Sequence, residues 1–396
     1  MIMEKDKETN KEINQSEQSH PSQKSAVQTM VGFKNTEVGL IPEDWEVKKL
    51  GVVVEIKKGQ LITEKTAIPD GIPVIGGGMT ISYFHNKPNR TGVTITISAS
   101  GAYAGYVSIH SKPIFASDCS TISEGEKYDI YFLYFCLLNK QREIYGLQTG
   151  GGQPHVYPQQ LRDLFIAIPK YKAEQTAIAT ALNDADALIQ KLEQLIAKKR
   201  NIKTGAMQEL LKPKEGWEVK TLGQIADLYQ PETISQEKFT NDGFLVYGAN
   251  GIVGKYDKYN HEHWQTIITC RGSTCGTVNK TVDKCWITGN AMVANVDRNT
   301  SVDKLFFYFL LTRQDFSNCI TGSGQPQIVR KPLFEYYVWL PKQKSEQTRI
   351  AQILSDMDSE IEALERQLAK YKLLKQGMMQ VLLTGKIRLV KSVQHG

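Results

Sequence analysis

The sequence predicts an α+β protein in which two α/β globules, related by pseudo-two-fold symmetry, are separated by two long antiparallel coiled-coil helices. Two observations carry this prediction. The chain repeats itself: shifted by 172 positions, Trp45 falls on Trp217, and the register still holds where Met207 falls on Met379. Each copy also changes once from a glycine-rich, β-favouring stretch to a long run of helical periodicity. Because solenoid repeats are only about 20–45 residues long, a period of this length indicates two domains.

The repeat divides the chain into five segments. Residues 1–35 contain almost no apolar side chains, and such a segment cannot bury enough surface to order itself, so we expect a disordered polar tail. A first globule, a first long helix, a second globule and a second long helix follow. Their expected bounds are residues 36–170, 171–212, 213–342 and 343–390.

Each globule should be a mixed α/β structure with a curved sheet. In the first copy, short β-favouring runs such as residues 72–75 and 93–97 are broken by glycines. One helix is expected over residues 130–138, because aromatic and leucine side chains recur there at helical spacing.

Each long helix carries a coiled-coil seam. Apolar residues recur in alternating steps of four and three over about three heptads, which is the a/d pattern. Neither helix can bury this stripe alone, and two copies in one chain make an intramolecular antiparallel pair the simplest solution. The expected seam residues are Ile178, Leu182, Ala185, Ile189, Leu192 and Ile196, with Ile350, Leu354, Met357, Ile361, Leu364, Leu368 and Tyr371.

Composition narrows the class of protein. At 396 residues the chain exceeds the size at which one hydrophobic core stops growing, and its net charge of +6 permits a nucleic-acid partner without requiring one. No run of about 18 apolar residues and no signal-peptide pattern occur, so we expect no membrane span and a cytoplasmic location. Six cysteines without a CxxC pair indicate a reducing compartment.

Catalytic motifs are missing from the sequence. It contains neither the Asn-Pro-Pro-aromatic motif of amino-methyltransferases nor a Walker A loop. His261 and His263 could offer two imidazoles on one side of a strand, but they lack a nearby Cys or carboxylate partner for a metal site. For Cys270 and Cys275, a metal or redox role is the alternative to plain reduced thiols. We therefore expect the chain to bind no cofactor or metal and to catalyse nothing on its own.

The two copies differ most in the middle of each globule. Residues 97–105 align with residues 268–276, where an Ile and two Gly positions are retained and the residues between them are replaced. A common scaffold that displays two different reading surfaces would have this pattern.

With these motifs, the chain from about Glu37 to Val390 resembles the specificity subunits of type I restriction-modification systems. The similar features are Thr-Glu-Val-Gly-Leu-Ile-Pro-Glu-Asp-Trp at residues 36–45, a Thr-Gly-x-Gly-Gln-Pro loop in both copies, Glu-Gln-Thr at the start of each long helix, and the ending over residues 375–388. The polar tail is a departure from this pattern.

The resemblance implies two target recognition domains that each read one half of a bipartite, asymmetric site in double-stranded DNA. It also implies that the helices dock two modification (methyltransferase) subunits, and that restriction (translocase) subunits complete an ATP-dependent endonuclease. S-adenosylmethionine, ATP and Mg²⁺ are then expected in the partner subunits. Adenine methylation and cleavage would reside there too.

Side chains that differ between the copies are the first candidates for reading bases. Arg271 could hold guanine O6 and N7 in two parallel hydrogen bonds or grip a phosphate. The aligned residue in the first copy is Ser100, so the two copies should read different bases. In the Gln-Pro loops, the glutamine is common to both copies, so the differing residues that follow the proline are the better base readers. The candidates on these loops are Ser100, Tyr103, His155, Arg271, Ser273 and Gln327.

Two basic and aromatic strips are candidates for contact with the DNA backbone. A solvated hairpin, and a surface salt bridge for Arg271, are the structural alternatives. The strip residues are Tyr83, Lys87 and Arg90 in the first copy, near His85, and Lys255, Tyr256, Lys258 and Tyr259 in the second.

The helices also carry apolar residues outside the seam, for which partner docking and burial against the globules remain equal alternatives. Two other functions also remain: a tether that binds two proteins and no DNA, and a self-contained enzyme of unfamiliar type. The apolar residues concerned are Leu188, Leu195, Met207, Leu210, Leu211, Leu373, Met378, Met379 and Leu382.

Overall fold

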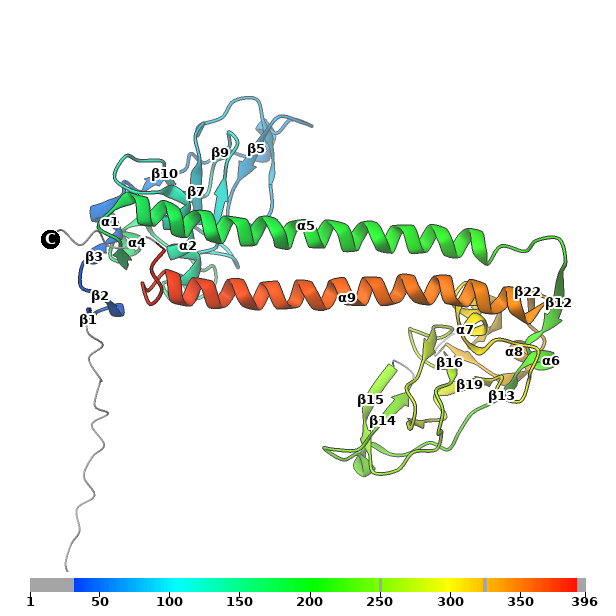
Figure 1. Ribbon diagram of the computed structural model, residues 1–396. Helices are drawn as coiled ribbons and strands as arrows, with labels where there is room; N and C mark the ends of the chain where they lie inside the picture. The colour runs from blue at the N-terminus through cyan, green and yellow to red at the C-terminus, as the bar shows by residue number, and fades with distance from the viewer. Residues whose placement is uncertain (1–31, 249–250, 323–325, 390–396) are drawn as a thin grey trace, which may run out of the picture. The chain divides into compact units, whose positions relative to one another are not determined.

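The computed structural model describes residues 32–248, 251–322 and 326–389 (Figure 1). The predicted polar tail lies outside these residues, except that a strand begins at Phe33, within the range assigned to the tail. The chain divides into two compact units: unit 1 is Met1–Asn183 with Gly377–Gly396, and unit 2 is Asp184–Gln376.

Unit 1 combines small sheets with short helices. Strands β4, β10, β7 and β8 form an antiparallel sheet in that order, β6, β5 and β9 form a second sheet in which β5 and β9 are parallel, and β3 pairs with β11. The strands are β1 (Phe33–Thr36), β2 (Gly39–Pro42), β3 (Glu46–Lys49), β4 (Lys57–Lys58), β5 (Ile72–Ile75), β6 (Tyr83–His85), β7 (Thr94–Ser98), β8 (Val107–His110), β9 (Phe115–Ala116), β10 (Cys119–Ser123) and β11 (Phe165–Ile168). The short helices are α1 (Leu50–Val53), η1 (Glu64–Thr66), α2 (Ile130–Asn139), α3 (Gln141–Tyr145) and α4 (Pro158–Arg162).

Unit 2 repeats this plan without the β1–β2 hairpin. Its sheets have the orders β13-β19-β16-β17, β15-β14-β18 and β12-β22, which match those of unit 1 strand for strand. The strands are β12 (Trp217–Thr221), β13 (Asp227–Tyr229), β14 (Phe244–Gly248), β15 (Gly251–Tyr256), β16 (Thr266–Thr269), β17 (Val278–Lys280), β18 (Trp286–Ile287), β19 (Ala291–Asn295), β20 (Ile320–Thr321), β21 (Gln327–Ile328) and β22 (Tyr337–Pro341). The short helices are α6 (Leu222–Ile225), η2 (Gln236–Lys238), α7 (Lys304–Thr312), η3 (Ser317–Cys319) and α8 (Arg330–Phe334).

The helix predicted over residues 130–138 is α2, and α7 is its counterpart. The N-cap residue of α2 is Asp129, whose carboxylate accepts backbone N–H bonds from Tyr131 and Phe132 at 3.0 Å. Asp303 caps α7 in the same way. A carboxylate at this position satisfies N–H groups that a helix leaves free at its start.

The Glu-Gln-Thr motif attaches each long helix to its globule. The Gln175 amide donates to Pro169 O (3.2 Å) and accepts from Asp129 N (3.0 Å), while the Thr176 hydroxyl donates to the Asp129 carboxylate (3.0 Å). Because Asp129 also caps α2, the motif joins the two helices through one side chain. In unit 2, the same three bonds, each 2.8 Å long, join Gln347 and Thr348 to Pro341 and Asp303.

The long helices are α5 (Lys172–Leu210) and α9 (Lys344–Leu382), and within unit 2 they run antiparallel (Figure 1). Every predicted seam residue is buried or half-buried, which confirms the a/d pattern. Interhelical ion pairs follow the antiparallel register, because the partner number falls as the residue number on α5 rises. Examples are Asp186–Lys375 (2.5 Å), Glu193–Lys372 (2.7 Å) and Lys199–Glu360 (2.6 Å).

The apolar residues outside the seam fall into two groups. Those near the C-terminal end of each helix pack into the core of the adjacent globule, Leu210 with Leu211 in unit 2 and Met379 with Leu382 in unit 1. Leu188, Leu195 and Leu373 remain exposed. Over the described ranges, no helix is both long and apolar enough to cross a membrane.

Truncating a seam residue should cost far more stability than truncating an exposed leucine on the same helix. Leu354 is fully buried in the unit 2 core, whereas Leu373 is 69% exposed. We expect Leu354→Ala to lower the free energy of unfolding by about 2–5 kcal/mol and Leu373→Ala by less than about 0.5 kcal/mol. Chemical denaturation measures both, and equal effects would contradict the assignment of the seam.

Candidate nucleic-acid interface

The loop that follows the central strand has the same backbone in both units. After β7, Gly105 N donates to Ser98 O (2.8 Å), and Gly101 adopts a left-handed φ of 83°. After β16, Gly276 N donates to Thr269 O (2.9 Å), and Gly272 has a φ of 85°. Glycine adopts this conformation without a steric penalty, which explains why Gly101 and Gly272 are both glycine.

A second loop pairs with the first in each unit. In unit 1, Gly101 N donates to Pro154 O (3.0 Å), and an antiparallel bridge joins Ser100 to His155. In unit 2, Gly272 N donates to Pro326 O (3.1 Å). The corresponding bridge joins Arg271 to Gln327.

The structure therefore brings together candidates that lie far apart in the sequence. Ser100 with His155 in unit 1 and Arg271 with Gln327 in unit 2 occupy matching places on matching backbones. Arg271 and Gln327 are exposed, whereas Ser100 and His155 are half-buried. The frame is common to both units and the side chains on it differ in size and charge.

Further side chains surround these pairs. Tyr103 is 47% exposed on the first loop of unit 1, and Ser273 is exposed on the same loop of unit 2. The His155 ring stacks on Tyr157, with ring centroids 5.9 Å apart. Of the glutamines common to the two loops, Gln153 is exposed and Gln325 lies outside the described residues.

Sequence reasoning missed one residue of this loop cluster in unit 1. The Ser100 hydroxyl donates a hydrogen bond to the carboxylate of Asp118, which lies between β9 and β10. Ala99 N donates to Asp118 O (3.1 Å), and in unit 2 Cys270 N donates to Asn290 O (3.0 Å). Asp118 and Asn290 thus occupy one position of the repeat, and comparing the copies at that position is the signal that could have found it.

The basic and aromatic strip of unit 2 is held by contacts with neighbouring side chains. Lys255, on β15, lies 3.8 Å from the Asp242 carboxylate, and Tyr256 packs edge-on against Trp286 at 5.1 Å between ring centroids. A hydrogen bond to Glu262 raises the pKa of Tyr259. The ammonium groups of Lys255 and Lys258 remain the groups best suited to phosphate contact.

The strip of unit 1 is more structural than we predicted. The Tyr83 hydroxyl donates to Ile62 O (2.9 Å), and the Arg90 guanidinium donates to Thr121 Oγ1 (2.9 and 3.0 Å), Asn89 O (2.8 Å) and Lys58 O (3.2 Å). Arg90 would have to leave these acceptors to reach a phosphate. Lys87 is exposed.

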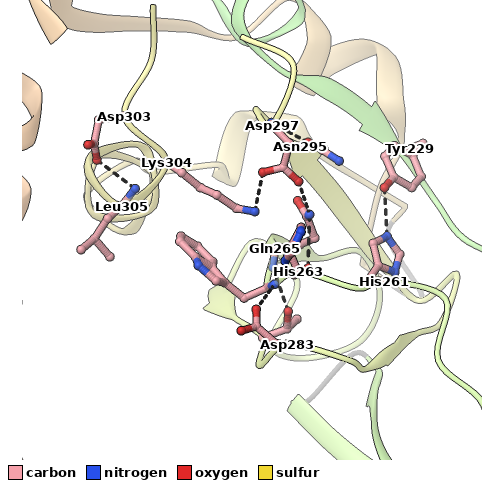
Figure 2. A network of polar contacts seen from close by, with 12 residues as sticks. Tyr229, His261, His263, Gln265, Asp283, Asn295, Asp297, Asp303, Lys304 and Leu305 are labelled. Atoms are coloured by element: carbon pink, nitrogen blue, oxygen red, sulfur yellow. Dashed lines mark hydrogen bonds and ion pairs between the residues drawn. The ribbon is translucent and has the colours of Figure 1, made fainter. Parts of the chain in front are cut away.

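In unit 2, His261 occupies the position of the repeat that Arg90 occupies in unit 1. His261 is part of a polar network (Figure 2). His261 Nε2 faces the Tyr229 hydroxyl (2.9 Å) and Nδ1 faces Asn260 Oδ1 (2.6 Å), while burial lowers its pKa. Nearby, Asp297 accepts hydrogen bonds from Lys304 (2.5 Å) and Gln265 (2.7 Å). Both nitrogens of His261 are engaged, and no cluster with metal-ligand chemistry occurs among the described residues.

The surroundings of the two cysteines near the unit 2 loops favour the neutral thiol. Burial raises the pKa of Cys270 to about 11 and also raises the pKa of Cys275. The thiolate is the nucleophilic form of cysteine, so a raised pKa lowers nucleophilicity at neutral pH.

A model of the type I restriction modification DNA specificity domain matches the chain twice, over residues 42–199 and 214–371. A type I restriction enzyme specificity subunit of Methanocaldococcus jannaschii is 22% identical over 90% of this chain and 96% of its own length. A putative type I specificity subunit of Mycoplasma pneumoniae is 29% identical over 52% of this chain and 60% of its own length.

Solved structures share the fold. The crystal structure of a type I restriction-modification system S subunit from M. genitalium aligns with a TM-score of 0.68 at 21% identity, covering 85% of this chain and 96% of that one. This likeness confirms the predicted fold class of two mixed α/β domains and long helices. The contacts of α5 and α9 add the antiparallel pairing.

Proposed function

Because the chain belongs to the type I restriction-modification DNA specificity family, we propose that its two specificity domains read the two halves of one bipartite, asymmetric DNA site. One observation carries this proposal: the two units present different side chains on one backbone frame, Ser100 with His155 in the first and Arg271 with Gln327 in the second. Identical side chains would read two identical half-sites. Because the side chains of the two units differ, we expect two different half-sites. We expect the half-sites to lie about one helical turn apart on one face of the DNA.

The proposal assigns docking to the long helices and catalysis to the partners. Leu188, Leu195 and Leu373 are exposed apolar side chains on α5 and α9, and such side chains are suited to a protein partner. Two modification subunits on the repeated halves would supply methylation, and restriction subunits would supply cleavage. S-adenosylmethionine, ATP and Mg²⁺ would be bound by those partners, and this chain would supply sequence recognition alone.

Exchange of one domain tests the proposal. Replacing residues 45–169 with the corresponding segment of another specificity subunit should change the first half-site and leave the second unchanged, because each domain makes its own base contacts. Sequencing of DNA selected from a random pool by the full-length chain with its modification subunits gives the readout. A change in both half-sites, or in neither, would count against domain-by-domain recognition.

A further inference from the structure

Asp118 places a negative charge within the loop cluster that we propose contacts DNA. It is half-buried, and among the described residues it receives a side-chain hydrogen bond only from the Ser100 hydroxyl and forms no salt bridge. Two other half-buried aspartates differ from it: Asp129 and Asp303 each accept two backbone N–H bonds and a threonine hydroxyl. Asp118 therefore retains free acceptor capacity that the fold does not use.

The surrounding loops hold this carboxylate in place. The Ser98 hydroxyl donates to Gly77 O (2.7 Å), so the glycine-rich loop after β5 is anchored beside Ser100 and Asp118. A Cβ on Gly77 would lie 2.7 Å from Ser100 O and 3.2 Å from Asp118 Oδ2, which only glycine avoids. Three chain segments thus meet at the carboxylate, and His155 pairs with Ser100 on its other side.

A carboxylate near DNA is repelled by phosphates, so it reduces affinity unless a base donates a hydrogen bond to it. In the major groove, only cytosine N4 and adenine N6 are amino donors, whereas guanine and thymine present acceptors. From the position and free acceptor capacity of Asp118, we infer that this residue, oriented by Ser100, determines specificity in the first domain by accepting a hydrogen bond from the exocyclic amino group of a cytosine or adenine. This inference rests on the proposed function.

The second domain has the opposite chemistry at the same place. Asn290 replaces Asp118, and the exposed guanidinium of Arg271 replaces the hydroxyl of Ser100. A donor-rich guanidinium suits guanine, which an acceptor-only carboxylate would reject. The two domains should consequently prefer different bases at the matching positions of the two half-sites.

The test combines one substitution in the protein with one deletion in the DNA. The full-length chain, with its modification subunits, selects its preferred site, and each cytosine or adenine of the first half-site is then replaced by pyrimidin-2-one or purine, which lack the amino group. At one position we expect this deletion to weaken binding by the unmodified protein about 5- to 150-fold. Asp118→Ala, which removes both acceptor oxygens, should lose most of this discrimination. The base at which this occurs distinguishes cytosine from adenine.

Two further variants complete the test. Asp163→Ala removes an equal charge from the exposed Asp163–Lys49 pair in the same domain and should leave the discrimination intact. Ser100→Ala keeps the carboxylate but removes the hydroxyl that orients it. This variant should weaken discrimination at the same position even if Asp118→Ala fails to fold. Unchanged discrimination in both loop variants, with a bipartite site still selected, would overturn the inference while the proposed function stands. If no bipartite site is selected by the unmodified protein, both fail.

Discussion

Arg388→Ala is expected to lower the free energy of unfolding by about 3 kcal/mol, the lower end of the range for breaking a buried ion pair. The Arg388 guanidinium donates to both oxygens of Asp44 at 2.9 Å and to both oxygens of Glu174, with Nη2 to Oε2 at 2.7 Å. Glu174 is only 2% exposed, so removing its cation would leave a buried carboxylate unpaired.

The corresponding junction of unit 2 shows which connection Arg388 replaces in unit 1. There the short linker from α5 leads directly to Trp217, whose indole N–H donates to Glu346 (3.3 Å). In unit 1 the corresponding junction has no covalent link, since the segment after α9 meets the segment before Trp45 from the other end of the chain. Arg388 joins them, and Gly385, with a φ of 69°, packs so closely that a Cβ would lie 2.4 Å from Pro42 Cγ.

A matched control separates this effect from the general loss of a charge. Arg366→Ala removes an exposed arginine of α9 that pairs with Glu362 one turn away, and should cost less than about 0.5 kcal/mol. Urea denaturation of both variants gives the comparison. An Arg388→Ala variant as stable as Arg366→Ala would show that Arg388 does not hold the junction together.

The pH dependence of stability should change with the same substitution. The hydrogen bond from Arg388 is the largest cause of the lowered pKa of Asp44, whose ordinary value is 3.8. A lowered folded-state pKa contributes stability that is present above the ordinary value and is lost as the pH falls below it. Arg388→Ala should therefore flatten the acid limb of the stability curve below a pH of about 3.8.

Arg271→Ala is expected to weaken binding to the preferred site about 5- to 150-fold and to relax base preference at one position of the second half-site. Arg271 is exposed on the loop after β16 and pairs through the backbone with Gln327. Its guanidinium could therefore hold guanine O6 and N7 in two parallel hydrogen bonds. Fluorescence anisotropy with the selected site and its single-base variants measures both effects.

Two companion variants distinguish base reading from phosphate contact. Arg271→Lys keeps the charge but loses the paired donor geometry, so it should recover affinity for all sequences without recovering base preference. Arg298→Ala removes another exposed arginine of unit 2 and should leave base preference unchanged. If Arg271→Ala weakens binding to every sequence equally, Arg271 contacts phosphate and the assignment to guanine is wrong.

The parts of the fold that depend on local periodicity could be predicted from the sequence. The seams of α5 and α9 and the position of α2 follow from spacing alone, and the duplication shows which loops correspond. The partners of individual polar groups could not be predicted. Arg90 belongs to a basic and aromatic strip and is therefore predicted to contact phosphate. In the fold, its guanidinium instead donates to Thr121. Arg388 bonds to Glu174 across 214 positions of sequence, where no local pattern links them.

Asp118 shows the same limit within the candidate interface. Acidic residues are unfavourable near phosphates, so a search for basic and aromatic side chains passes over it. A comparison of the two copies shows that Asp118 and Asn290 differ, and the approach of Ser100, 18 positions earlier, places Asp118 in the loop cluster. The contact with Ser100 depends on the fold and could not be predicted from the sequence.

Selection of DNA from a random pool by the unaltered full-length chain with its modification subunits shows directly whether the two domains read two different half-sites. We expect one enriched site made of two short, different half-sites with a fixed gap, because Ser100 with His155 and Arg271 with Gln327 are different side chains on one frame. Enrichment of a single contiguous motif, of two identical half-sites, or of no sequence at all would contradict it.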